Sequence, residues 1–429
     1  MMPRNLRLWL RKPIVGWILY DIASSGYIAM IPAIAYAVYY RQIVCGGAAG
    51  CDARWAVWVS LALAVAGLLS PLLGAIADLG ALRHRLFVAT TLLCGFATAA
   101  LYSVQPGAVW LGGILFFLAQ TGYLLSMALY DAYIPDLVPS QQAGRLSGLG
   151  WGLGYLGEFI CYILFLLLQQ GNPVDSSIFY RQLFFVVAVF SVGMALPALA
   201  WLPRQSSSMT ISPGKLIYRS YTQVGQTLRN WQHTPELFKF LLGFCLISAG
   251  IMTIVSFIGI YLSTQFGLTV AQILQLSLLF DLVAIPCTIV CGILSDLWSA
   301  KSLLRVLLGI WVVVILLMVF STHPATPLLI AVLLGVVLGS TQSLCRGLFA
   351  QMVHTAQATE LFGFNSLVGK MSAILGPLVF GFISSATENQ RIATASLLVF
   401  FCLGGVVLNQ VKYTTGRLEE ENKTIARFQ

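Results

Sequence analysis

Four ionisable side chains interrupt long apolar stretches of this chain and are the residues best suited to chemistry. They are Asp21, Glu158, Asp281 and Lys370. Near the centre of a membrane-spanning helix, such a group costs about 2.5 to 3.5 kcal/mol unless it is paired or hydrated. Asp21 lies near the start of its stretch and the other three lie near the middle of theirs. A partner, water or a bound solute must therefore offset this cost.

These charges indicate either a coupling role or structural ion pairs. A carboxyl group in apolar surroundings can be neutral while it faces one side of a membrane and ionised while it faces the other, so it can carry a proton. Glu158 is our first candidate for that role. Lys370 could pair with Asp281 or with Glu158, or it could bind the carboxylate of a solute, and these alternatives stay open.

Aromatic and hydroxyl side chains surround Asp21. Trp17, Ser24 and Ser25 share its helical face, and Tyr20 precedes it. The group could line a cavity that binds a polar solute or a proton. The alternative is a cluster of hydrogen bonds that joins neighbouring helices.

An acid and two arginines lie at the end of another apolar stretch, at Asp78, Arg83 and Arg85. The segment 74–85 resembles the loop motif between the second and third helices of major facilitator proteins. An aspartate at a membrane boundary can accept hydrogen bonds from the start of a neighbouring helix and pair with an arginine, which would lock one domain arrangement. A weaker copy ends at Asp296. The alternative is a solvated helix end with ordinary interfacial charges.

The residue pattern argues against an enzyme. The segment 363–371 is the closest match to a phosphate-binding loop, but it has five residues between its glycines and Met371 in place of Ser or Thr. The four histidines are dispersed, without the spacing of metal ligands. We therefore predict no catalytic residue, no cofactor and no metal.

Twelve apolar stretches position all of these residues. Hydrophobic residues make up 58% of the chain and charged residues only 9%, and the mean hydropathy is +0.86. A stretch of about 20 apolar residues crosses a membrane as a helix, because backbone amides must pair inside the segment. We predict an all-α membrane protein whose spans lie near 14–40, 54–78, 85–103, 108–130, 145–169, 181–202, 236–262, 270–296, 302–321, 326–350, 360–384 and 392–411.

The spans fall into two related halves. An offset of about 219 residues aligns Gly144 with Gly363 and Gly157 with Gly376, which indicates a duplication. We expect parallel repeats that form two pseudo-symmetric six-helix bundles, as in the major facilitator fold. The predicted parts are an interfacial segment at 1–13, bundles at 14–202 and 236–411, a basic loop as linker at 203–235, and a tail at 412–429.

Glycines gather in the fifth span, where Gly150, Gly154 and Gly157 share a face. A smooth face of this kind lets a neighbouring helix approach closely. It could be static packing or the surface of a gate between domains.

The basic residues predict the orientation. If the N-terminus is cytoplasmic, 18 of the 24 Lys and Arg residues lie on that side and four on the other, so both termini are expected inside. The net charge of +9 is scattered over loops near the membrane. This favours contact with anionic lipid headgroups over nucleic acid.

Two of the nine cysteines, Cys45 and Cys51, lie in the first outward loop. An oxidising outer compartment would permit a disulfide there, and two free thiols are the alternative.

Several blocks of sequence resemble the vacuolar-effluxer-like (autophagy-related 22) branch of the major facilitator superfamily, over all twelve spans. The blocks are Trp17–Ser25, Tyr130–Pro135, Arg145–Tyr155, Gly339–Ser343 with Arg346 and Phe349, and Phe362–Lys370. The chain departs from that branch at Ile22, Asp131 and Glu158, where an aromatic residue, Asn and a small residue are common.

The resemblance implies a secondary transporter that alternates access by rocking its two bundles, with a cavity lined by spans one, four, seven and ten. Fungal relatives are associated with amino-acid export from the vacuole. We expect solute contacts from Tyr20, Asp21, Ser24, Gln120, Tyr123, Gln342 and Arg346. We expect coupling or gating from Glu158, Asp281, Lys370, Asp78, Arg83, Arg85, Asp131 and Asp296.

The predicted function is transport of a small polar organic solute, with an amino acid or related metabolite as the best single guess and a proton as the candidate coupling ion. The alternatives are a lipid or lysolipid flippase and a receptor without transport activity. We expect a monomer in a bacterial inner membrane, in contact with lipids and not with nucleic acid.

Overall fold

The computed structural model describes residues 9–47, 50–169, 177–205, 212–229 and 234–413. Within these residues twelve helices are long and apolar enough to cross a membrane, and no strand is present. The all-α prediction and the number of spans are confirmed. Most of the predicted segment 1–13 and of the tail 412–429 lies outside the described residues.

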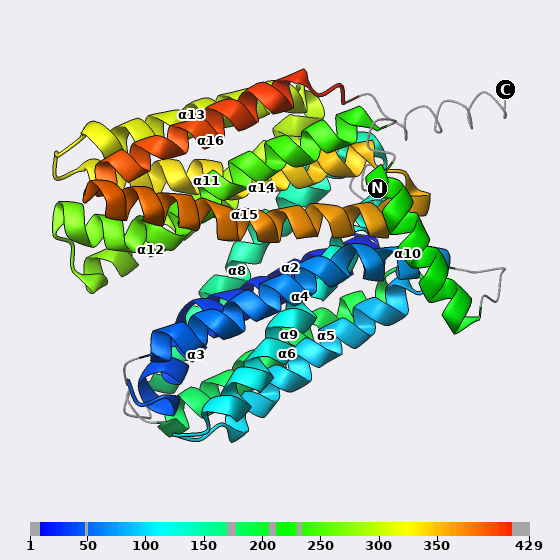
Figure 1. The fold of residues 1–429 in the computed structure, drawn as a ribbon, viewed down its shortest axis with the longest axis horizontal. Helices are drawn as coiled ribbons and strands as arrows, with labels where there is room; N and C mark the ends of the chain where they lie inside the picture. The colour runs from blue at the N-terminus through cyan, green and yellow to red at the C-terminus, as the bar shows by residue number, and fades with distance from the viewer. Residues whose placement is uncertain (1–8, 48–49, 170–176, 206–211, 230–233, 414–429) are drawn as a thin grey trace. The chain divides into compact units, whose positions relative to one another are not determined.

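Six long helices form the first bundle (Figure 1). They are α2 (Lys12–Ile28), α4 (Cys51–Leu79), α5 (Arg83–Ala100), α6 (Val109–Asp131), α8 (Ala143–Gln169) and α9 (Ser177–Trp201). Four pairs pack side by side: α2 with α9, α5 with α6, α4 with α6, and α5 with α9.

The second bundle repeats this arrangement. Its helices are α11 (Pro235–Phe266), α12 (Val270–Leu297), α13 (Ala300–Phe320), α14 (Thr326–Met352), α15 (Ala358–Thr387) and α16 (Gln390–Gln410). The corresponding four pairs pack together: α11 with α16, α13 with α14, α12 with α14, and α13 with α16. The duplication predicted from sequence is therefore a duplication of helix packing.

Three helices are divided between the compact units, namely α8, α15 and α10 (Pro213–Arg229). The first unit comprises Met1–Leu137, Leu153–Thr222 and Thr359–Gly363, and the second comprises Val138–Gly152, Gln223–Ala358 and Phe364–Gln429. The first turns of α8 thus pack with the second unit, and the first turns of α15 pack with the first unit. The start of α15 contacts Asp78, and the start of α8 contacts Asp296 and Arg346.

The first span changes between α-helical and π-helical geometry. After α2, the chain forms a π-helical turn (Ala29–Ile34) that contains Pro32, then α3 (Ala35–Val38) and a second π-helical turn (Tyr39–Val44). Proline has no N–H to donate, and its ring displaces the preceding turn, so the helix widens there. The span ends at Val44, beyond the predicted end at residue 40.

The glycines of α8 face two directions. Gly154 and Gly157 lie against α2, where a Cβ on Gly154 would be 2.8 Å from Ser25 Oγ and one on Gly157 would overlap the Ile22 carbonyl oxygen. Gly148 lies against α12, where its Cβ would be 2.6 Å from Gly292 Cα. Gly154 and Gly157 therefore take part in packing within the first bundle, and the gate alternative for this face stays a prediction.

A matched pair of glycine variants tests this packing. Gly157→Ala should lower the melting temperature of the detergent-purified protein, because the new methyl group meets backbone that cannot move away cheaply. Gly193→Ala should be neutral or slightly stabilising, because Gly193 in α9 has open space around it and Ala favours helix. Equal melting temperatures for the two variants would contradict this account of the α2–α8 contact.

The linker contains a helix, which corrects the prediction of a loop over 203–235. Helix α10 (Pro213–Arg229) occupies about its middle half. Its inner face includes Leu216 and Ser220, which are buried, while its outer face is exposed. Apolar residues at helical spacing favour a helix even where charged residues lie between them. The many polar residues of this segment made that spacing hard to recognise in the sequence.

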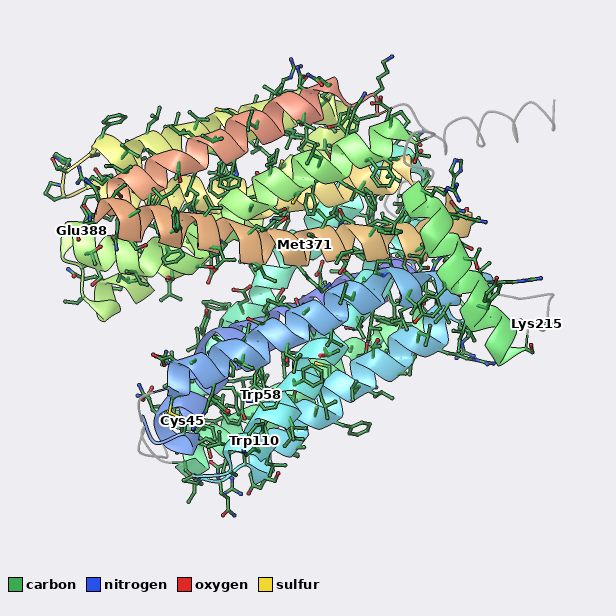
Figure 2. The ribbon with its side chains drawn as sticks, in the orientation of Figure 1. Cys45, Trp58, Trp110, Lys215, Met371 and Glu388 are labelled. Carbon is green, nitrogen blue, oxygen red and sulfur yellow. A yellow bond between two sulfur atoms is a disulfide. The ribbon has the colours of Figure 1, made fainter. Side chains whose placement is uncertain are left out.

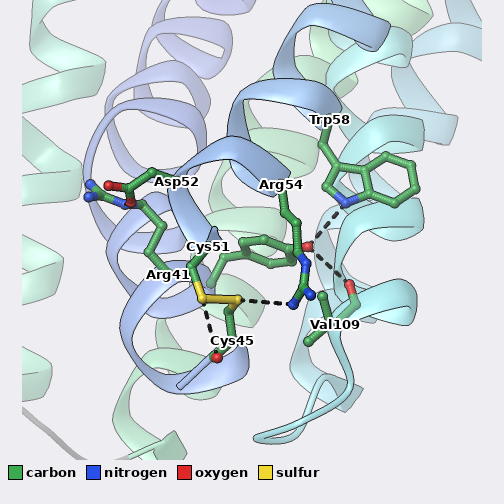
Figure 3. The surroundings of a disulfide bond; sticks show 8 residues. Arg41, Cys45, Cys51, Asp52, Arg54, Trp58 and Val109 are labelled. Carbon is green, nitrogen blue, oxygen red and sulfur yellow. Dashed lines mark hydrogen bonds and ion pairs between the residues drawn. A yellow bond between two sulfur atoms is a disulfide. The ribbon is translucent and has the colours of Figure 1, made fainter. Parts of the chain in front are cut away.

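Cys45 and Cys51 form a disulfide that closes the turn between the first two spans (Figures 2 and 3). Arg41 pairs with Asp52 beside it, and Arg54 donates to Cys45 Sγ. The disulfide is therefore confirmed over the alternative of two free thiols.

Candidate functional site

A small cavity with several hydroxyl groups in an otherwise apolar lining lies inside the first bundle, where α2, α5, α6 and α9 meet. Tyr20 anchors it: its hydroxyl donates to Ser126 Oγ at 2.7 Å and lies 3.0 Å from Thr91 Oγ1. Ser24 and Tyr123 also line it. Three of the predicted solute contacts therefore share one cavity.

The cavity is too small for an organic solute. Its volume is about 30 Å³, whereas ligand pockets span about 300 to 1,000 Å³ and one water needs roughly 10 to 15 Å³. Gln120 lies beside it and accepts from Tyr27 Oη at 3.1 Å. Asp21 is 5% exposed, and its carbonyl accepts from Ser24 Oγ at 3.0 Å. In this structure the cavity can hold one or two waters.

Four hydroxyl residues of this cavity were missed by sequence reasoning. They are Thr91 and Thr98 on α5, Ser126 on α6 and Ser191 on α9, and all of them line it. Each is a single small polar residue in an apolar span, and such residues are common in membrane helices. Only their convergence on Tyr20 marks Thr91 and Ser126 as part of a network.

In the second unit, Arg346 binds the beginning of α8. Its Nε donates to Ser147 Oγ at 2.8 Å and its Nη2 donates to the Ser147 carbonyl at 3.0 Å. The guanidinium also lies 5.8 Å from the centroid of the Trp151 ring, within the range of a cation–π contact. Gln342, one turn earlier on α14, is 8% exposed and makes no hydrogen bond among the described residues.

Asp281 on α12 is buried without a partner. Its side chain is 5% exposed, and no hydrogen bond or ion pair joins it to the described residues. The Lys370 ammonium instead donates to Ser366 Oγ. The predicted alternative of a Lys370–Asp281 pair is therefore absent from this structure. Glu158 belongs to the first unit, and its pairing with Lys370 stays a prediction.

Asp78, at the end of α4, accepts hydrogen bonds at the start of α15. Its Oδ2 accepts from the Glu360 backbone N–H at 2.9 Å and its Oδ1 accepts from Thr359 Oγ1 at 2.5 Å. Arg83 lies 3.5 Å from the same carboxylate and donates to Thr359 Oγ1 at 2.7 Å. An anion at a helix start is stabilised by free N–H groups and by the helix dipole.

Arg83 has further partners that sequence reasoning missed. It pairs with Asp136, and it donates to the Ala132 carbonyl at 3.1 Å. Its guanidinium lies 5.3 Å from the centroid of the Tyr133 ring. Asp136 directly follows the Tyr130–Pro135 block, and this proximity was the available signal. Asp131, half-buried, is the last residue of α6 just before these contacts.

The second unit carries a counterpart of the Asp78 contact. Asp296, at the end of α12, accepts from the backbone N–H of Arg145 at 3.2 Å. Arg145 is the third residue of α8, as Glu360 is the third residue of α15. Lys301 takes no part, because its ammonium donates to the Val411 carbonyl at 3.2 Å.

The fold matches solved transporters over nearly its whole length. The human organic anion transporter MFSD10 (TETRAN) aligns with a TM-score of 0.70 at 14% identity, over 95% of this chain and 100% of that one. A bacterial homologue of the iron transporter ferroportin aligns with a TM-score of 0.70 at 16% identity, over 92% and 97%. Together with the repeated bundles, these matches define a major facilitator fold.

Sequence comparison gives the family. The model described as "Vacuole effluxer Atg22 like" matches residues 54–421, and the chain belongs to that family. The uncharacterized MFS-type transporter YxiO of Bacillus subtilis is 27% identical, over 92% of this chain and 93% of its own length. Autophagy-related protein 22-1 of Emericella nidulans is 20% identical, over 72% and 67%. The resemblance inferred from sequence blocks is confirmed, and the chain is a secondary transporter of the major facilitator superfamily.

No group of three or more His, Cys, Asp or Glu residues that could hold a metal ion occurs in the part of the chain that the structure describes.

Two neighbouring arginines provide a test of the Asp78 contacts. Arg83→Gln should destabilise the protein by about 3 to 5 kcal/mol, because it leaves the buried Asp78 carboxylate without its cation. Arg85→Gln should change stability by less than about 0.5 kcal/mol, because Arg85 is exposed. Urea or thermal unfolding followed by tryptophan fluorescence would measure both, and similar losses would contradict the assignment.

Proposed function

We propose that this transporter moves a small polar organic solute, with an amino acid or a related zwitterion as the best candidate, and that it couples transport to protons. The support for a zwitterion is chemical. The first unit carries Asp21, which suits an ammonium group, and the second carries Arg346, which suits a carboxylate. The first unit also carries neutral donors and acceptors at Tyr20, Ser24, Gln120 and Tyr123, and the second carries one at Gln342.

The state of Asp281 is the observation that carries proton coupling. A buried carboxylate without a partner is costly when ionised, so protonation would relieve that cost, and hydration on the other face of the membrane would restore the charge. Glu158 is the second candidate for this role. Lys370 is proposed to respond to the charge of the coupling group.

The Asp78 and Asp296 contacts are proposed as paired latches. Each joins the end of one span to the start of a span from the other half of the sequence. In our proposal alternating access makes and breaks these hydrogen bonds, while Arg83, Asp131 and the exposed Arg85 adjust the local charge. The two bundles, taken as 14–202 and 236–411, are the proposed moving parts.

We propose a bacterial inner membrane as the location, with both termini cytoplasmic and the protein working as a monomer. The Bacillus relative and the excess of basic residues on one side support this placement. The Cys45–Cys51 disulfide would then face the oxidising side.

Flux into proteoliposomes tests the solute and the coupling together. Radiolabelled amino acids should accumulate against their gradient when a pH gradient is imposed, and accumulation should stop when an ionophore collapses that gradient. Accumulation that is indifferent to the ionophore would exclude proton coupling. Movement of labelled lipid without movement of any amino acid or organic acid would exclude the proposed solute class.

Substitution separates the two candidate acids. Asp281→Asn should abolish accumulation driven by the pH gradient while preserving counterflow exchange, because exchange needs no net proton movement. Glu158→Gln is the parallel variant, and Glu388→Gln is the control, because Glu388 is exposed at the end of α15. If Asp281→Asn accumulates solute like the control and Glu158→Gln does not, the coupling role passes to Glu158.

The disulfide tests the orientation in intact cells. A membrane-impermeant reductant followed by a large maleimide should label Cys45 and Cys51, whose loop is exposed to water outside in the proposed topology. A variant with both cysteines changed to serine should lose this label. Labelling only after the cells are opened would reverse the topology.

A further inference from the structure

Helix α10 carries an apolar stripe on its outer face. Ile217, Tyr221 and Leu228 are 48%, 61% and 53% exposed, and with Val224 they follow the spacing i, i+4, i+7, i+11 of one helical face. A stripe of this size in water is unfavourable and requires an apolar partner. None of the transport roles proposed above uses it.

The opposite edge of α10 is basic. Lys215, Arg219 and Arg229 are all exposed, and Figure 2 shows Lys215 extending outward near the beginning of the helix. No Asp or Glu occurs anywhere from residue 203 to residue 235. An exposed apolar stripe beside basic residues is the pattern of a helix that lies in the interface of an anionic membrane.

The position of α10 brings it to the membrane boundary. The inner side chain of Leu216 lies against Gly80, where a Cβ would be 3.1 Å from Leu216 Cδ2. Gly80 directly follows the span Cys51–Leu79. Figure 1 shows α10 running crosswise to α5, as a helix in the plane of a membrane runs relative to a spanning helix. The next span begins at Pro235, only a few residues after Arg229.

We propose that α10 binds the lipid surface, with its apolar stripe inserted among acyl chains and its basic residues on anionic headgroups. Leu216 then ties this surface to the loop between α4 and α5, which also holds Asp78 and Arg83 near its ends. Binding of α10 to anionic lipid would therefore hold the loop between α4 and α5 in place. The acidic run Glu419–Glu421 near the end of the chain could attract the same basic residues, but it offers no partner for the apolar stripe.

Hydrogen exchange of the full-length protein in nanodiscs tests this proposal. The amides of α10 should exchange about tenfold more slowly in phosphatidylcholine with 30% phosphatidylglycerol than in phosphatidylcholine alone, because each cation near an anionic surface contributes several-fold to binding. High salt should reduce the difference, because it screens the surface charge.

Three variants make the result specific. Changing Lys215, Arg219 and Arg229 together to Gln should remove the dependence on phosphatidylglycerol. Changing Ile217 and Leu228 to Ser should speed exchange in both kinds of nanodisc. Arg305→Gln, at an exposed arginine of α13 outside α10, is the control and should behave like the unaltered protein.

Deletion of residues 414–429 tests whether the acidic tail, and not lipid, covers α10. The protection by phosphatidylglycerol should survive this deletion. Loss of protection on deletion would assign α10 to the tail instead of lipid. Equal exchange in both nanodiscs for the unaltered protein would also overturn the proposal, and neither result would bear on solute flux.

Discussion

A charged or strongly polar group inside an apolar helix bundle must be given donors, acceptors or water, and the described contacts of this protein follow from that constraint. Asp78 accepts from Thr359 and from a backbone N–H of α15, and Arg83 is surrounded by oxygen atoms and a tyrosine ring. These bonds offset the cost of removing the charges from water. They also make the contact sensitive to position, because the partners come from α4, from α15 and from the segment that follows α6.

Close approach of backbones is the second requirement, and glycine supplies it. Gly74 precedes Asp78 by one turn, and a Cβ there would be 2.7 Å from Glu360 Cα. Gly292 has the same place before Asp296, with a Cβ 2.8 Å from Gly148 Cα. Without these glycines the aspartates could not reach the first N–H groups of α15 and α8. The repeat therefore preserves both the acceptor and the space that lets it act.

Asp281 departs from this rule of satisfied charges, and for that reason we propose a role for it in coupling. A structural role would bring a partner, as Arg83 shows, and the described residues provide none for Asp281. The free-energy cost of burying the ionised Asp281 carboxylate without a partner in one conformation can be removed in another conformation that hydrates or pairs it. Local instability of this kind is expected at sites that change charge during a transport cycle.

The amino-acid sequence by itself determined the twelve spans and the repeat, because hydropathy and glycine spacing are local properties of the chain. It offered the contact of Asp78 with a helix start as one of two alternatives. It also placed Tyr20 and Ser24 in one polar group around Asp21, and it named Tyr123 only among the expected solute contacts. It did not reveal α10, whose pattern is diluted by polar residues, or Asp136 and Thr359 as partners of Arg83. Only the tertiary structure decided that the cavity beside Tyr20 admits water and not a solute, that Arg346 binds Ser147, and that Asp281 has no partner. These facts depend on distances between residues far apart in the chain, and no local pattern records such distances.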